Sequence, residues 1–165
     1  MSSLVVIVLL IVVLVTSTVS GVFGMAGGLM LMGALTLAMP VSAAMVTHGA
    51  VQFVSNGWRA VLWARYIDLW IVGRYVLGLL TALAIFAMVR IVPDRALVLI
   101  VLGILPFIGL AVPDRLSPRA DRPAGAEIAG FVGTALQLIS GVSGPVLDIF
   151  FVRCLMDRRQ VVATK

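Results

Sequence analysis

The chain has 165 residues, of which 62% are hydrophobic and only 12% are charged, and this balance excludes an ordinary soluble domain. Its net charge of +5 comes mainly from arginines between apolar runs. Such arginines suit lipid headgroups better than a nucleic-acid surface, so we expect a lipid bilayer and no nucleic acid as partner. One cysteine and one histidine are too few for an intrachain disulfide or a metal site of nitrogen and sulfur ligands, and we expect no cofactor.

The first 58 residues contain no Asp, Glu, Lys or Arg, which indicates more than one passage through a membrane. Residues 1–20 lack the basic start of a signal peptide and lead into further apolar sequence, so we favour an uncleaved first span over a cleaved signal. Charge-free runs predict an all-α, polytopic helical membrane protein with about five apolar segments. These segments are residues 4–23, 34–57, 75–89, 96–113 and 128–147.

A glycine-rich stretch, SGVFGMAGGLMLMG, follows the first apolar run and contains Gly21, Gly24, Gly27 and Gly28. It is not a phosphate-binding loop, because it has no GxGxxG and no Lys-Ser or Lys-Thr after it. Two interpretations stay open. Gly24 and Gly28 have the GxxxG spacing of closely packed helices, and the same glycines would allow a broken helix whose freed N–H groups bind an anion.

A polar stripe follows in PVSAAMVTHGAVQFVSNGWR, residues 40–59. His48, Gln52 and Asn56 are spaced four apart, with Ser55 and Arg59 on the neighbouring line of the same helix. Because polar groups are costly against lipid, the stripe should face protein or water. It could serve as interhelical hydrogen bonding or as part of an anion pathway, in which His48 would carry a proton and Arg59 would hold the anion.

The next apolar run, residues 75–89, is short, so we expect it to extend backward through IDLWIVGRY. Arg74 would then reach a lipid headgroup or pair with Asp68. Residues 91–96 predict a tight turn between neighbouring spans, and the proline- and arginine-rich residues 112–127 predict a solvent loop. The arginines are distributed about evenly between the two sides of the membrane, so the positive-inside rule does not determine the orientation, and we leave the topology open.

An internal repeat organises the chain, because the first glycine motif, SGVFG, recurs as SGVSG at residues 140–144, followed by Pro145. Downstream, AAMVTH has a weaker counterpart in QVVATK, which places Thr47 opposite Thr164. A proline directly after the glycines favours a second break at Gly141 and Gly144. Asp148, just after this break, would mark the membrane edge or take part in coupling.

The repeat predicts three parts: a first transmembrane repeat over residues 1–111, a polar loop over 112–127, and the start of a second repeat over 128–165. The second copy stops where the first continues. We therefore expect that the chain is a fragment or that a partner supplies the missing spans.

These motifs together resemble the TauE/SafE family of sulfite and sulfonate exporters. The resemblance lies in SGVFGMAGG followed by MPVSAAMVTH and N-x-x-R, and then in SGVSGPVLDIFF followed by MDRRQVVATK. It implies a multi-pass protein of the bacterial inner membrane with two related halves. By position, the family's glycine motifs fall on Gly21, Gly24, Gly27 and Gly28, and on Gly141, Gly144 and Pro145. Two differences are an SGP in place of a fuller glycine run, and an end after VVATK where family members continue.

We therefore predict a permease for small anions such as sulfite, sulfonates or other organic acids, with export driven by the proton gradient as an option. The alternative is a membrane scaffold or accessory subunit that transports nothing. The sequence offers no paired acids, second histidine or nucleophile elbow, so we do not expect an enzyme. The sequence does not decide whether the protein forms a homo-oligomer, which we keep as a possible partner.

Overall fold

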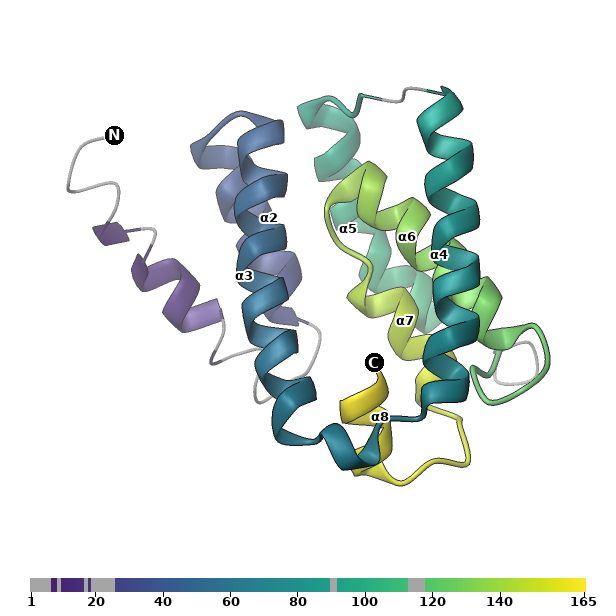
Figure 1. Ribbon diagram of the computed structural model, residues 1–165. Coiled ribbons are helices and arrows are strands. Elements are labelled where there is room, and N and C mark those ends of the chain that lie inside the picture. The colour runs from purple at the N-terminus through teal and green to yellow at the C-terminus, as the bar shows by residue number, and fades with distance from the viewer. Residues whose placement is uncertain (1–6, 9, 17, 19–25, 90–91, 113–117) are drawn as a thin grey trace.

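The computed structural model describes residues 7–8, 10–16, 18, 26–89, 92–112 and 118–165, and this part of the chain is helical without any β-strand (Figure 1). Residues 7–18 include a first helical stretch. The elements after it are α2 (Ala26–Ala38), α3 (Val41–Leu62), the 3-10 helix η1 (Ala64–Tyr66), α4 (Leu69–Val89), α5 (Arg95–Ala111), α6 (Gly125–Ser140), α7 (Gly144–Phe151) and α8 (Arg158–Thr164). The predicted all-α fold is confirmed.

The predicted second apolar segment, residues 34–57, is wrong as a single element, because the chain turns within it. Helix α2 ends at Ala38 and α3 begins at Val41, so Pro40 lies at the turn of a helical hairpin. Proline lacks an N–H and fixes its own backbone angle, which suits the start of a helix and not its interior. A charge-free run therefore concealed a turn, and α3 extends five residues further than the predicted segment, to Leu62.

Helix α4 begins at Leu69 and confirms the backward extension of the 75–89 run. It is the one helix in the described part of the chain that is both long and apolar enough to cross a membrane; shorter apolar helices are Gly27–Ala38, Arg95–Ile108 and Gly125–Ser140. Arg74 does not pair with Asp68, as one alternative proposed. The Asp68 carboxylate instead accepts from the N–H groups that begin α4, and Arg74 forms an ion pair with Glu127 of α6 while lying 4.5 Å from the ring centre of Trp70.

Helices α4 and α6 approach each other so closely that only glycine, which has no Cβ, fits at their contact points. A Cβ added at Gly78 would lie 2.8 Å from the backbone N of Phe131, and one added at Gly130 would lie 2.9 Å from the backbone C of Tyr75. Small residues let membrane helices pack backbone against backbone, which replaces the hydrophobic driving force that lipid does not provide. The sequence signal for this contact was four-residue spacing of small residues, such as Gly78 with Ala82.

The connection before α6 is polar, as predicted, but its described part docks on the fold. Ala120 is fully buried, and its N–H donates to the carbonyl oxygen of Phe150 over 3.0 Å. Asp121 accepts two hydrogen bonds from Arg119, at 2.6 and 3.0 Å, and one from the N–H of Leu155. The Arg119 hydrogen bonds are the main reason that the pKa of Asp121 falls to about 2. This loop therefore ties the start of α6 to the connection between α7 and α8.

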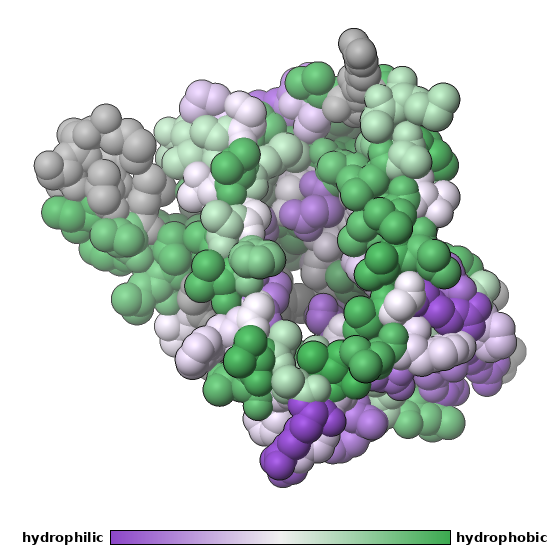
Figure 2. Space-filling model, in the orientation of Figure 1, coloured by the Kyte–Doolittle hydropathy of each residue, from purple (hydrophilic) through white to green (hydrophobic). Residues whose placement is uncertain are grey.

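Large apolar side chains cover much of the outer surface (Figure 2). On α3, Val46, Phe53 and Trp58 are exposed, and Phe53 has 81% of its surface accessible. A soluble protein rarely exposes continuous apolar surface, whereas a membrane protein presents it to lipid. The surface is therefore that of a helical membrane protein.

Candidate functional site

The described helices form two groups, with α2 and α3 on one side and α4 to α8 on the other (Figure 1). Figure 2 shows that the face is hollowed between α3 and the region of α6 and α7, with hydrophilic atoms around and inside the hollow. We call this space the central hollow. In Figure 1 the chain ends beside it, because α8 runs inward from the edge of the molecule.

The predicted second break is present between α6 and α7. Helix α6 ends at Ser140, Gly141 adopts a left-handed φ of 77°, and α7 begins at Gly144 with Pro145 in its first turn. The left-handed region is strained for residues with a Cβ, so glycine is needed at position 141. The run 128–147, expected as one apolar segment with a break, is thus two helices joined by three residues.

Side chains from α6 hold this break in place. Gln137 donates from Nε2 to the carbonyl oxygen of Gly141 over 2.7 Å, and its Oε1 accepts from the Ser143 hydroxyl over 3.2 Å. Ser140 donates to the carbonyl oxygen of Val142 over 3.0 Å. These bonds satisfy carbonyl groups that a helix end leaves free. The sequence analysis missed Gln137 and Ser143, although both are polar residues within an apolar run.

Only some of the predicted motif glycines lie in the described part of the chain. Gly21 and Gly24 are outside the described residues. Gly27 and Gly28 are buried in the first turn of α2. A Cβ added at Gly141 would meet the Met32 side chain at 2.8 Å, so the second break packs against α2.

Gly28, His48 and Gln52 form one contact between α2 and α3. A Cβ at Gly28 would lie 3.2 Å from Nε2 of Gln52 and 3.8 Å from Cε1 of His48. His48 is 1% exposed, and its Nδ1 has no hydrogen-bond partner in the described part of the chain. A buried polar atom without a hydrogen-bond partner is rare and costs free energy. Such an atom is typical of a functional position. The structure therefore brings three of the predicted residues together.

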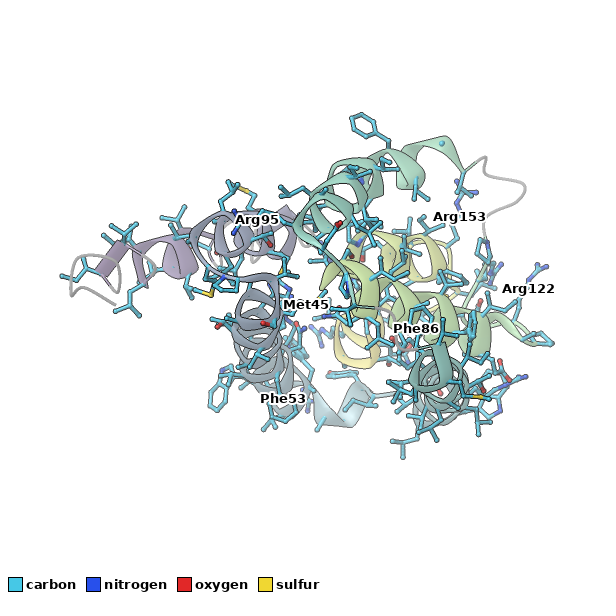
Figure 3. All side chains as sticks on the ribbon, turned by 90° about the horizontal axis from the view of Figure 1, so that it is seen from above. Met45, Phe53, Phe86, Arg95, Arg122 and Arg153 are labelled. Carbon is cyan, nitrogen blue, oxygen red and sulfur yellow. The ribbon has the colours of Figure 1, made fainter. Side chains whose placement is uncertain are left out.

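The polar stripe of α3 is rotated relative to the prediction. His48, Gln52, Ser55 and Arg59 are buried or half-buried, whereas Asn56 is exposed. We call the first four residues the inner line. In Figure 3, Met45 lies on the side of α3 that faces the other helix group, and Phe53 points away from it.

Gln52 and Arg59 lie one and two heptads beyond Met45, so they share its face. The predicted role of Asn56 on this face has no support in its position.

A second polar pair lies opposite the inner line. Asp148 of α7 and Lys165, which follows α8, form an ion pair with side chains 17% and 23% exposed. Lys165 also borders a cavity of about 100 Å³, whose other lining residues are Ile71, Val72, Tyr75, Leu147, Phe151 and Thr164. Helix α3, which carries Arg59, contacts α8, which leads into Lys165, so these two cations come from neighbouring helices. The sequence analysis weighed Asp148 but did not single out Lys165.

One protein family has a sequence model that matches the chain. It is described as "Sulfite exporter TauE/SafE", and the match covers residues 9–165. No curated protein and no solved structure matches the chain.

Proposed function

Because the chain belongs to the TauE/SafE family of sulfite exporters, a membrane transporter family, we propose that it is a multi-pass permease of the bacterial inner membrane that exports small anions. The proposed substrates are sulfite, sulfonates or other organic acids. The observation that supports this proposal best is the inner line of α3, which places polar and cationic groups on the face toward the central hollow while apolar side chains cover the opposite face. A packed scaffold does not need a guanidinium on its inner face.

The chemistry of this face suits a small oxyanion. Arg59 offers a planar fork of donors that matches the oxygens of a sulfonate or sulfite group, and the Gln52 amide adds a neutral donor one heptad away. The broken region adds the positive end of α7, which starts at Gly144. Discontinuous helices with their N-termini near the substrate are a common arrangement in transporters. We therefore propose that Gly27, Gly28, Gly141, Gly144 and Pro145 shape the pathway while the inner line binds the anion.

Within this proposal His48 carries the coupling proton. Its buried position and the unpartnered Nδ1 leave one ring nitrogen free to accept a proton as the pathway opens to water. An imidazole is the side chain whose charge changes most readily near neutral pH. His48→Gln should therefore retain sulfite exchange at equal pH on both sides and lose the acceleration caused by an imposed pH gradient.

The direct test is sulfite flux in proteoliposomes that contain the full-length protein. With an imposed pH gradient, Arg59→Ala and His48→Ala should each lower the flux by about tenfold or more, because the first removes the charge-assisted contact to the anion and the second removes the proton carrier. Asn56→Ala is the matched control, since Asn56 is on the same helix but exposed. Flux in all three variants equal to that of the wild type would remove the inner line from the pathway and favour the scaffold alternative.

A further inference from the structure

We propose that Lys165 is the second cationic contact of the transported oxyanion, and that the Asp148 carboxylate occupies this contact when no anion is bound. The inference rests on the proposed function and adds two residues from the second half of the chain to the binding site. It also names the chemical requirement on the ligand, which is a small oxyanion able to replace a carboxylate at an ammonium group.

The geometry of the pair supports such an exchange. Asp148 lies on α7, four residues beyond Gly144, the first residue of that helix, and Lys165 follows α8. Lys165 lines the cavity of about 100 Å³, which is large enough for several water molecules and so for a group of a few oxygens. The cavity therefore provides space beside Lys165 for a small oxyanion.

The position of Lys165 is held by its neighbours. The hydroxyl of Thr164 accepts from the N–H of Asp68 over 3.0 Å and so fixes the end of α8 to the start of α4. Arg59 belongs to α3, and that helix contacts α8. Two cations carried by contacting helices, Arg59 on α3 and Lys165 after α8, attract an anion more strongly than either does alone. A single carboxylate, Asp148, offsets part of this charge in the empty state.

The repeat gives an independent reason for the assignment. The register that aligns Ser20 with Ser140 also aligns Gly28 with Asp148, and the register that aligns Thr47 with Thr164 aligns His48 with the next residue, Lys165. In the structure a Cβ added at Gly28 would lie 3.8 Å from Cε1 of His48, so the first pair are neighbours, and Asp148 and Lys165 form an ion pair.

The helices of these two pairs also run in opposite directions, because α3 descends and α8 ascends in the view of Figure 1. Inverted repeats place their substrate between such matching positions. Where the first pair has a glycine, the second has a carboxylate. In the second pair, the Asp148 carboxylate can therefore occupy the place of an anion at Lys165.

The experiment measures sulfite binding to the purified full-length protein by isothermal titration calorimetry, with Asp148→Asn, Lys165→Gln and the double variant. Asp148→Asn should tighten binding by about fivefold, because the carboxylate no longer competes for the ammonium group. Lys165→Gln should weaken binding by about tenfold or more. The double variant should match Lys165→Gln, since Asp148 acts only through Lys165.

Glu127→Gln is the matched control, because Glu127 also belongs to a half-buried ion pair, with Arg74, between two helices. It should leave the sulfite affinity unchanged. A merely structural pair would lower the affinity, or leave it alone, in both single variants, and either result overturns the inference. Opposite signs for the two variants support it.

The outcome separates this inference from the proposed function. If the wild type binds sulfite and Arg59→Ala weakens binding while Asp148→Asn and Lys165→Gln do not change it, only the role of the Asp148–Lys165 pair is overturned. If the wild type binds neither sulfite nor a sulfonate, the proposed function and the inference both fail.

Discussion

The crossing of α4 and α6 provides the sharpest test of how this fold is held together. Gly78→Ala adds one methyl group at the closest point, where the new Cβ would lie 2.8 Å from two backbone atoms, the C of Glu127 and the N of Phe131. Ordinary contact begins at 3.4 Å, and backbone atoms cannot rotate away as a side chain can. The two helices must therefore separate along the crossing.

Gly73→Ala is the matched control, because Gly73 is on the same helix and a Cβ there would have nothing within 4 Å. Both substitutions gain the same helix propensity, so the difference between them isolates the clash. Overpacking of this kind costs about 1–3 kcal/mol, which corresponds to a change of roughly fivefold or more in the ratio of folded to unfolded protein.

The assay is a titration with sodium dodecyl sulfate in mixed micelles, followed by circular dichroism and by the fluorescence of Trp70 on α4. The midpoint for Gly78→Ala should fall clearly below that for Gly73→Ala. If Gly78→Ala is as stable as Gly73→Ala, the close approach of α4 and α6 does not exist in the folded protein, and the account of its packing is refuted.

Three further predictions concern the inner line, the second break and the loop before α6. In a background without the native cysteine, Gln52→Cys should react with a water-soluble thiol reagent and the lipid-facing Phe53→Cys should not; equal reactivity would contradict the orientation of α3. Gly141→Ala should lower the thermal midpoint, at a cost of about 1–3 kcal/mol for its positive φ and tight contact, whereas Gly144→Ala, which has open space, should change it little; the reverse order would contradict the break. The folded pKa of Asp121, about 2, lies below its ordinary value, so its hydrogen bonds stabilise the fold above about pH 4 and this contribution disappears as the pH falls toward 2. Asp121→Asn should lack that part of the pH dependence in thermal unfolding, and an unchanged profile would contradict it.

Composition and charge were sufficient to predict the helical class and several helix positions. The C-terminal end of α4 and the start of α5 follow from where the charges lie, because a helix in lipid must be largely apolar, although Arg74 lies within α4 and Pro106 within α5. The break at Gly141 was also predictable, since a glycine motif followed by Pro145 disfavours a continuous helix. The repeat and the three-part division of the chain remain predictions.

The turn at Pro40 and the orientation of α3 were harder to predict from the sequence. In a run without charges, hydropathy does not show where one helix ends and the next begins, so the α2–α3 hairpin was taken as one segment. The spacing of polar residues put Asn56 in the stripe because four-residue steps fit one face of a helix about as well as alternating three- and four-residue steps do. In the structure Ser55 is half-buried and Asn56 is exposed, so the packing of α3 decided which of the two lies on the inner side.

The sequence by itself determined that this is a helical membrane protein with a break at Gly141, because those features depend on local composition and on which residues tolerate lipid or a left-handed turn. Only the tertiary structure decided which residues from different helices contact one another. Arg74 meets Glu127, Asp148 meets Lys165, and Gly28 meets His48 and Gln52, across separations that no local pattern encodes. Which charge neutralises which depends on how the helices cross, and that depends on close packing of small residues summed over the whole chain.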